Sequence, residues 1–364
     1  MKKKPADNPI LAEAMEHADP TSERSHAARY REMEMKLAKA TGALKLEGQR
    51  RQHAEDELTE TREQLEAYLE IGDKANPRAL KRLKQKGGGQ ATAIICANDW
   101  HSEANIEHAS SGYTNRYDLN IAKARIDRLW HKAVYLLEFS RKISNIRDAV
   151  LWLGGDLING YIHEELQEGN FLGPADASLW VIERASEGID YLLREADLDK
   201  LTIPCSIGNH GRSTAKTRIS TGYRSSWEWM AYNTLARMYR DNPKVEFVLD
   251  HGYHCWVDIQ GHGVRFHHGD AIKFGGGVGG VHIPLRKKRA QWDKIRPAKL
   301  DVLGHFHQFI DEWNYIISGC ICGFDAYALS IGAEYQPPTQ AFAVIDREYG
   351  KTMALPIFCE AVQI

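Results

Sequence analysis

The sequence contains no run of about 18 apolar residues, so it predicts no membrane-spanning helix. Its basic start, Met1 to Lys4, is not followed by the apolar segment of a secretory signal. The six cysteines include no Cys-x-x-Cys pair, and Cys320 and Cys322 are too closely spaced for a zinc clip. We therefore expect a cytoplasmic protein with reduced core cysteines. The net charge of −2 gives no argument from bulk charge for a nucleic-acid partner.

Proline and glycine are scarce over one long stretch near the N-terminus. Residues 21–71 contain no proline and only two glycines, Gly42 and Gly48, which predicts a long helix. With 43% hydrophobic residues in a chain of 364, the remainder can bury a large core. We expect a disordered tail, a long helix, a basic linker and one globular domain at residues 1–18, 19–73, 74–90 and 91–364.

An apolar seam with alternating steps of three and four residues runs along the predicted helix, which is typical of a coiled coil. Glu47, Arg51 and Thr61 interrupt the seam and weaken its middle. We expect the helix to pair with a second copy or with a partner protein; the alternative is that it packs on its own globular domain. The seam consists of Tyr30, Met33, Leu37, Ala40, Leu44, Glu47, Arg51, Ala54, Leu58, Thr61, Leu65 and Tyr68.

Five short motifs follow apolar runs that predict buried strands, and helical segments separate several of these runs, which indicates the α/β class. In open α/β sheets, ligands bind beyond the carboxyl ends of the strands, so the motifs would converge there. Carboxylates, an amide and imidazoles at one place are suitable ligands for two divalent metals. The motifs are Asp99-Trp100-His101, Gly155-Asp156-Leu157-Ile158-Asn159, Gly208-Asn209-His210, His268-Gly269-Asp270 and Gly304-His305-Phe306-His307.

The order of these motifs, over about residues 91–320, resembles the calcineurin-like metallophosphoesterase superfamily. The stretches Gly208–Arg218 and Tyr327–Gly332 are similar to a phage-encoded branch related to DNA repair exonucleases. The resemblance implies a four-layer fold of two packed mixed β-sheets flanked by helices, here preceded by the long helix. It implies a two-metal-dependent phosphoester hydrolase, located in the host cytoplasm if the chain is phage-encoded.

The resemblance also assigns metal ligands residue by residue. One metal would be bound by Asp99, His101, Asp156 and His307, and the other by Asp156, Asn209, His268 and His305. Asp156 would thus bridge both ions. Of the neighbours His267 and His268, only one can face the metals because side chains alternate along a strand, and the family pattern favours His268. Mixed imidazole and carboxylate ligands suit Mn²⁺, with Fe or Zn as alternatives, and argue against an all-oxygen Mg²⁺ or Ca²⁺ site.

The resemblance gives His210 the catalytic role of protonating the leaving oxygen or of stabilising the transition state, while a water that bridges the metals attacks phosphorus. Two positions depart from the family pattern. Gly211 follows His210 where many relatives carry an acidic residue that orients the histidine, and Asn159 stands where nuclease relatives often have histidine. The partner that orients His210 is therefore open.

Basic residues form three local clusters, two of which follow strands of the predicted site, where a nucleic-acid backbone would pass. We expect Arg212, Lys216, Arg286 and Lys287 to bind substrate. The preferred function is a phosphodiesterase or nuclease acting on nucleic acid; a phosphomonoesterase or protein phosphatase is one alternative, and a non-catalytic assembly protein with a vestigial site is another. The clusters are Lys81, Arg82, Lys84 and Lys86; Arg212, Lys216, Arg218 and Arg224; and Arg286, Lys287, Lys288 and Arg289.

Overall fold

The computed structural model describes residues 23–74, 89–273 and 279–360. It has two units, an N-terminal helical unit and a domain whose first strand begins at Gln90. The N-terminal unit contains helix α2 (Glu23–Lys74), which is 52 residues long. The predicted long helix is therefore confirmed, whereas the predicted tail of residues 1–18 and most of the predicted linker lie outside the described residues.

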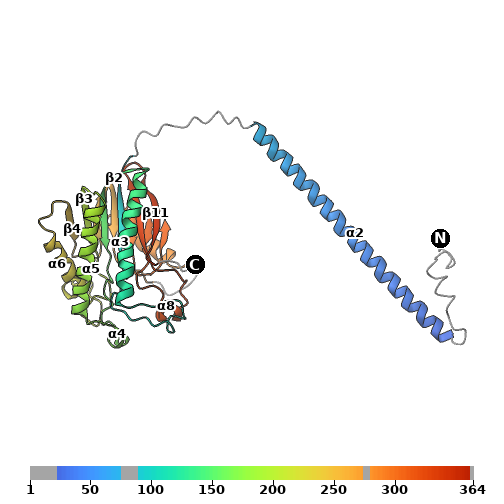
Figure 1. Ribbon diagram of the computed structural model, residues 1–364, viewed down its shortest axis with the longest axis horizontal. Helices are drawn as coiled ribbons and strands as arrows, with labels where there is room; N and C mark the ends of the chain where they lie inside the picture. The colour runs from blue at the N-terminus through green and yellow to red at the C-terminus, as the bar shows by residue number, and fades with distance from the viewer. Residues whose placement is uncertain (1–22, 75–88, 274–278, 361–364) are drawn as a thin grey trace. The chain divides into compact units, whose positions relative to one another are not determined.

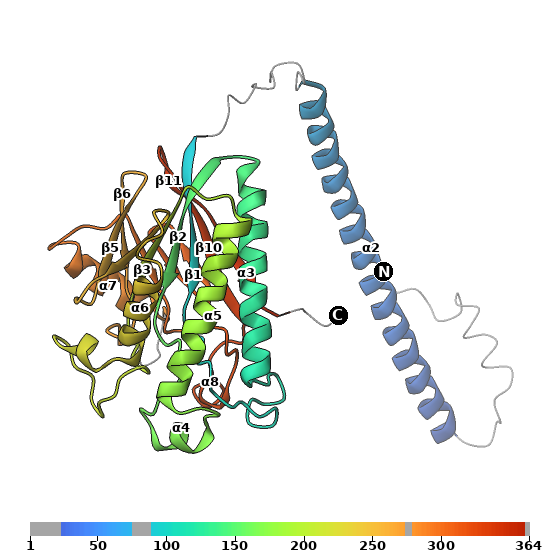
Figure 2. The ribbon, with the colours of Figure 1, turned by 60° about the vertical axis from the view of Figure 1, so that its left-hand side comes forward.

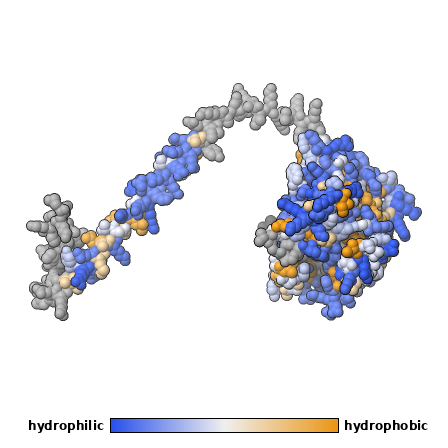
Figure 3. Space-filling view, turned by 180° about the vertical axis from the view of Figure 1, so that it is seen from behind, coloured by the Kyte–Doolittle hydropathy of each residue, from blue (hydrophilic) through white to orange (hydrophobic). Residues whose placement is uncertain are grey.

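The side chains of α2 interact mainly within the helix itself. Lys36 pairs with Glu32, one turn earlier, at 2.7 Å, and Thr41 donates a hydrogen bond to the Leu37 carbonyl. Leucines of the predicted seam are exposed, with 54% of Leu37 and 70% of Leu44 accessible. Figure 3 shows that apolar side chains gather on the N-terminal half of α2, while its C-terminal half is largely hydrophilic. The N-terminal half of the seam is thus the part best suited to be buried against a partner.

The first sheet of the domain has six strands in the order β11-β10-β1-β2-β3-β4. Strands β1 to β4 run parallel, and β10 and β11 are added antiparallel beside β1, so the sheet is mixed. Its strands are β1 (Gln90–Ala97), β2 (Asn145–Leu153), β3 (Lys200–Cys205), β4 (Val245–Leu249), β10 (Thr339–Asp346) and β11 (Gly350–Phe358).

The second sheet has five strands in the order β5-β6-β7-β9-β8 and is also mixed. Strands β6, β7 and β9 are parallel, and β5 and β8 pair antiparallel at the two edges. Its strands are β5 (Cys255–Ile259), β6 (His262–Phe266), β7 (Leu300–Leu303), β8 (Ile310–Glu312) and β9 (Tyr315–Ile317). The five predicted strands correspond to β1, β2, β3, β6 and β7 and are confirmed.

Helices cover the outer faces of the sheets. Figures 1 and 2 show α3 and α5 side by side over one face of the first sheet, with α6 further along. The helix α7 packs on the second sheet through Leu285, which belongs to one hydrophobic cluster with Leu303, Tyr315 and Ile317. The helices are α3 (Leu119–Arg141), α4 (Glu164–Gly169), α5 (Pro174–Glu195), the 3₁₀ helix η2 (Gly222–Ser225), α6 (Trp227–Met238), α7 (His282–Trp292) and α8 (Ala326–Ser330).

Alternation along β1 builds two separate cores. Ala93 and Ile95 face the layer of helices, whereas Ile94 and Cys96 face the second sheet. Because successive side chains of a strand point to opposite faces, a strand buried on both sides appears in the sequence as a continuous apolar run. The layers are therefore helices, sheet, sheet and helix. The expected α/β fold of two mixed sheets flanked by helices is confirmed.

All six cysteines are buried and unpaired, as expected for core thiols. Within the described ranges, no helix combines the length and the apolar character that crossing a bilayer requires.

We predict that α2 forms a dimer through the seam, which the double variant Leu37→Glu/Leu44→Glu would weaken. Two charges per helix in the apolar half of the seam would be desolvated on pairing, and the interior Gly42 and Gly48, each costing about 1 kcal/mol relative to alanine, leave little stability in reserve. Light scattering of the full-length protein should show a shift toward the monomer mass.

The matched control is Met35→Glu/Leu46→Glu, which adds the same charge at exposed positions outside the seam. Since glutamate is a good helix former at all four positions, the helix itself should persist in every variant. An unchanged mass for the seam variant, or an equal change in both variants, would contradict the coiled-coil prediction.

Candidate metal centre

The five motifs occupy the loops that follow β1, β2, β3, β6 and β7, at the carboxyl ends of these strands. Glycine allows two of these loops to approach closely. A Cβ at Gly155, where φ is +85°, would overlap the backbone of Gly208, and a Cβ at Gly208 would overlap Asp156. The Gly-Asp and Gly-Asn pairs in the sequence therefore bring the loops after β2 and β3 into direct contact.

Candidate ligands in this centre adopt a backbone conformation that L-residues rarely use. The φ angle is +49° at Asp99, +44° at His101, +50° at Asp156, +71° at His305 and +55° at His307. Non-glycine residues in the left-handed region cost folding energy and cluster at functional sites. The surrounding loops hold these five residues in place against that cost.

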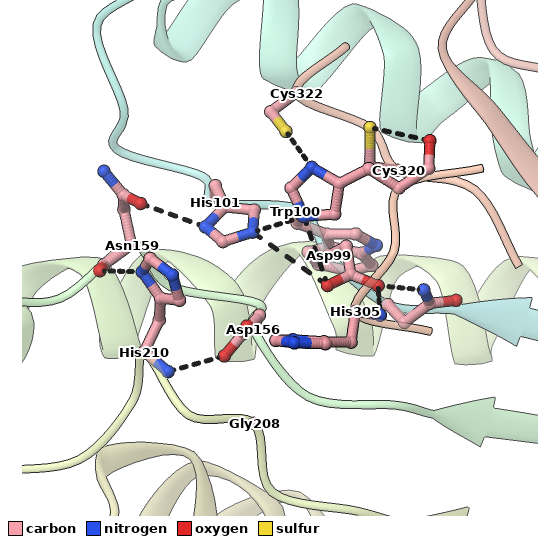
Figure 4. Close-up of polar contacts among 12 residues, drawn as sticks. Asp99, Trp100, His101, Asp156, Asn159, Gly208, His210, His305, Cys320 and Cys322 are labelled. Atoms are coloured by element: carbon pink, nitrogen blue, oxygen red, sulfur yellow. Dashed lines mark hydrogen bonds and ion pairs between the residues drawn. The ribbon is translucent and has the colours of Figure 1, made fainter. Parts of the chain in front are cut away.

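The first group of converging atoms lies around Asp99, which is fully buried. His307 Nε2 lies 3.5 Å and His101 Nε2 4.0 Å from Asp99 Oδ1, and the two imidazole nitrogens are 3.2 Å apart. The other carboxylate oxygen, Oδ2, accepts hydrogen bonds from the His305 backbone N–H and the Asn98 amide. Asp99 thus presents one unpartnered oxygen to two imidazoles (Figure 4).

The second group consists of Asp156, His268 and His305, whose ligand atoms lie within 4.8 Å of one another. His268 Nε2 is 2.9 Å from Asp156 Oδ2, while His268 Nδ1 is 2.9 Å from the Gly154 carbonyl. Since that carbonyl only accepts, Nδ1 carries a hydrogen, and Nε2 needs a proton or a cation between itself and the carboxylate. Asp156 also forms a group with Asp99 and His101, so it belongs to both groups.

Asn209 lies at the point where the loop after β3 meets Asp156. The backbone N–H of the next residue, His210, donates to Asp156 Oδ1 at 2.7 Å. Among the described residues, Asn209 Oδ1 and Asp99 Oδ1 are buried polar atoms without a hydrogen-bond partner, and His268 Nε2 lies next to the Asp156 carboxylate. Buried polar atoms normally find partners, and these three atoms are the ones that a metal would bind. The cluster therefore fits a divalent metal site.

Asn159 orients two histidines, a role that the sequence did not reveal. Its side-chain Oδ1 is 3.0 Å from His101 Nδ1, and its backbone carbonyl is 2.9 Å from His210 Nδ1 (Figure 4). Both oxygens accept, so each imidazole carries its hydrogen on Nδ1 and turns Nε2 toward the cluster. The Asn159 carbonyl is thus the orienting partner of His210 that sequence analysis left open.

The carboxylates and imidazoles of the centre strongly affect one another's pKa values. Burial would raise the pKa of Asp156, but the positive charge of His268 and then of His210 outweighs it and holds the pKa well below its ordinary value. Burial would lower the pKa of His268, but the Asp156 carboxylate holds it well above the ordinary value. Burial, together with His210 and His307, lowers the pKa of His101 to about 3, so that imidazole is neutral and free to coordinate.

Two buried glutamates that sequence analysis did not single out brace these loops. Glu228, from α6, accepts the backbone N–H groups of Leu157 and Gly208 at 2.7 Å each, and so links the neighbours of Asp156 and Asn209. Burial, and then repulsion from Asp156, raises the pKa of Glu228 to about 8. Glu103 accepts the N–H groups of Asn159 and Gly160 at 2.9 and 2.8 Å. No local pattern in the sequence marks either residue.

Three residues close to the predicted ligands are His267, Cys320 and Cys322. His267 points away from the cluster, and its Nε2 lies 3.6 Å from Asp301 in the second sheet, so His268 is the one of the pair that reaches the centre. Cys322 Sγ lies 3.9 Å from His307 Nδ1, and Cys320 Sγ lies 3.9 Å from the His307 carbonyl. The closely spaced cysteine pair, interpreted from sequence as structural, therefore borders the centre.

The four residues predicted to bind substrate have different surroundings. The Arg212 guanidinium donates to the carbonyls of Asn209 and Thr214 at 2.5 and 3.0 Å, so it holds its own loop. Arg286 pairs with Glu312 at 3.1 Å. Lys216 and Lys287 are exposed, and no carboxylate among the described residues pairs with either.

No protein-family model and no curated protein matches the sequence. The fold is similar to the sulfate thiohydrolase SoxB of Thermus thermophilus with glycerol, at 10% sequence identity and a TM-score of 0.33, over 76% of this chain and 58% of that one. It is also similar to an uncharacterized Streptococcus pneumoniae protein, a predicted phosphoesterase, at 11% identity and a TM-score of 0.26, over 73% of this chain and 97% of that one. A candidate 5′-nucleotidase of Staphylococcus aureus with alpha-ketoglutarate matches at 12% identity and a TM-score of 0.30, over 76% of this chain and 56% of that one. The chain spans little more than half of the first and third. Likeness at these TM-scores carries no weight for function, which rests on the geometry of the centre.

We predict that Glu228→Gln lowers metal affinity about 10- to 100-fold, the usual effect of losing a group that orients metal ligands. The amide would turn an NH₂ donor toward the N–H of Leu157 or Gly208, and the two loops would separate. Isothermal titration with Mn²⁺ measures the loss, and circular dichroism checks the fold. The control Glu187→Gln removes an exposed carboxylate that pairs with Arg184 on α5. Equal affinity in both variants would show that Glu228 does not position the ligands.

Proposed function

We propose that the protein is a two-metal-dependent phosphoester hydrolase that acts as a phosphodiesterase or nuclease on nucleic acid. The observation that carries the proposal is the sharing of Asp156 between two ligand groups, one with Asp99 and His101 and one with His268 and His305. A single carboxylate common to two clusters is the arrangement that a pair of ions held by one bridging residue requires.

The residues of the two groups would divide between the ions. Asp99, His101, Asp156 and His307 would hold one ion, and Asp156, Asn209, His268 and His305 the other. Two bound divalent ions acidify water and neutralise charge on phosphoryl oxygens. The mixture of nitrogen and oxygen donors favours Mn²⁺, Fe or Zn over Mg²⁺.

His210 has the position of a proton donor. Its Nδ1 hydrogen is directed to the Asn159 carbonyl, and its ring meets the His101 ring edge-on at 4.6 Å between centroids. The imidazole is therefore fixed beside the candidate ligands, with Nε2 available to hold a proton. A proton on Nε2 can pass to the leaving oxygen of a phosphoester, and so no alkoxide needs to leave unprotonated.

The preference for a nucleic-acid diester is supported by charge close to the centre. The chain from Gly211 to Trp227 carries four cations and no acidic residue, and it starts directly after His210. A polyphosphate backbone is attracted by such a strip, whereas a small monoester gains less from it.

The proposal is tested by measuring hydrolysis of single-stranded DNA, duplex DNA, RNA, a bis-aryl phosphodiester and an aryl monoester side by side. Activity should vanish with a chelator and return with Mn²⁺ more fully than with Mg²⁺, and diesters should exceed the monoester. Asp156→Ala should lose both metals, measured by elemental analysis, while Asp127→Ala, which removes a partly exposed carboxylate on α3, should keep them. Full activity in chelator, or a preference for the monoester, would refute the proposal.

We predict that His210→Gln keeps both metals and lowers kcat by about 10²–10⁴, the usual contribution of a positioned acid. Glutamine can still donate to the Asn159 carbonyl but cannot deliver a proton. The loss should shrink for a bis-aryl diester, whose leaving group needs no proton, compared with DNA. Loss of metal from this variant would instead make His210 a ligand.

A further inference from the structure

The chain from Gly211 to Ser226 forms a loop, here called the basic loop, whose base is fixed beside the candidate metal centre. Ser213 N–H donates to the Ser225 carbonyl at 2.7 Å, and Trp227 N–H donates to the Gly211 carbonyl at 2.8 Å, which closes the loop. Arg212 binds the Asn209 carbonyl from within the base. Both ends of the basic loop are therefore tied to the residues that follow β3.

Aromatic packing fixes the C-terminal end of the basic loop, around Tyr223. Tyr223 stacks on His251 with 4.3 Å between ring centroids, and Trp229 meets both rings edge-on. Arg224 donates to the Tyr223 hydroxyl at 3.0 Å. The base is thus a packed platform, and the tip of the loop projects from it.

The tip carries positive charge without compensation. Lys216 and Arg218 are exposed, and across the described ranges no carboxylate lies within 4.0 Å of either. Ile219, next to them, is 95% exposed. Like charges held together repel, and an exposed isoleucine gains nothing from water, so the tip is suited to a partner that is both anionic and partly apolar.

The arginines of α7, which belong to another basic cluster, are already paired. Arg286 pairs with Glu312, and Arg289 donates to the buried Asp301 and the Ala298 carbonyl at 2.5 Å each. These bonds hold α7 to the second sheet, so the two guanidinium groups already have partners. In the basic loop, Lys216 and Arg218 follow the candidate ligand Asn209 by seven and nine residues, and no carboxylate among the described residues pairs with either.

We propose that the tip of the basic loop, from Lys216 to Ile219, binds the sugar-phosphate backbone of a nucleic acid whose scissile phosphate lies at the metal centre. Lys216 and Arg218 neutralise phosphates and Ile219 contacts a base or sugar face. The tip thereby makes polymers better substrates than small diesters. This inference rests on the proposed function and names the element that selects its substrate.

The test compares Lys216→Gln/Arg218→Gln with the wild type in two assays. In chelator, fluorescence anisotropy measures the binding of a labelled single-stranded oligonucleotide over a range of salt. The dependence of log K on log salt should flatten by about 1.4, or roughly 0.7 for each lost phosphate contact on a single strand. With Mn²⁺, the ratio of kcat/KM for the oligonucleotide to kcat/KM for the bis-aryl diester should fall about tenfold or more.

The matched control is Lys142→Gln/Lys299→Gln, which removes two exposed cations beside the amino ends of β2 and β7. A third double variant, Lys287→Gln/Lys288→Gln, tests whether α7 binds the nucleic-acid backbone instead. An unchanged salt dependence and ratio in the loop variant, an equal change in the control, or a change confined to the α7 variant would overturn the inference. So would binding of the tip to anionic lipid vesicles but not to the oligonucleotide.

These outcomes are distinguishable from failure of the proposed function. If the wild type hydrolyses no diester, the proposed function fails, while the binding assay in chelator still tests the loop. If it hydrolyses the diester and the ratio does not respond to the loop variant, only the loop inference fails.

Discussion

Negative charge placed out of water is the constraint on which the rest of this domain depends. Asp99 and Asp156 are buried at the carboxyl edges of the strands, and a buried carboxylate is tolerated only beside positive charge or hydrogen-bond donors. Backbone and amide N–H groups satisfy one oxygen of Asp99, and imidazoles surround the other. The loops after five strands must therefore meet within hydrogen-bond distance, and the two-sheet scaffold brings their ends together.

The same logic extends to the residues that hold the loops. Glu103 and Glu228 each use both carboxylate oxygens to accept two backbone N–H groups, one pair from a single turn and one pair from two different loops. Buried acceptors of this kind satisfy donors that a tight loop would otherwise leave unpaired. The centre thus has an inner set of groups directed at cations and an outer set directed at the backbone, and damage to the outer set reaches the inner set through the loops.

The sequence predicted the elements whose signal is local. Continuous apolar runs such as Ala93–Ala97 marked strands buried on both faces, and the polar motif after each run marked the site. Glu228 could not be found this way, because its role depends on where the N–H groups of two distant loops lie. Arg212 looked like a free cation, yet the turn that follows His210 directs its guanidinium to carbonyls of the same loop. Asn159 looked like the loss of a histidine, whereas its two oxygens orient two others.

The left-handed backbone of five candidate ligands lowers the stability of the fold. These residues are Asp99, His101, Asp156, His305 and His307. Each such residue costs of order 1 kcal/mol or more, and a glycine in its place would relieve the strain while deleting a side chain that could hold a cation. A library of variants sorted for heat resistance alone would therefore accumulate glycines at the edge of the sheet and lose the side chains that could hold a cation. The domain thus keeps its candidate metal ligands at some cost in folding stability, and that cost comes from the φ angles of five residues.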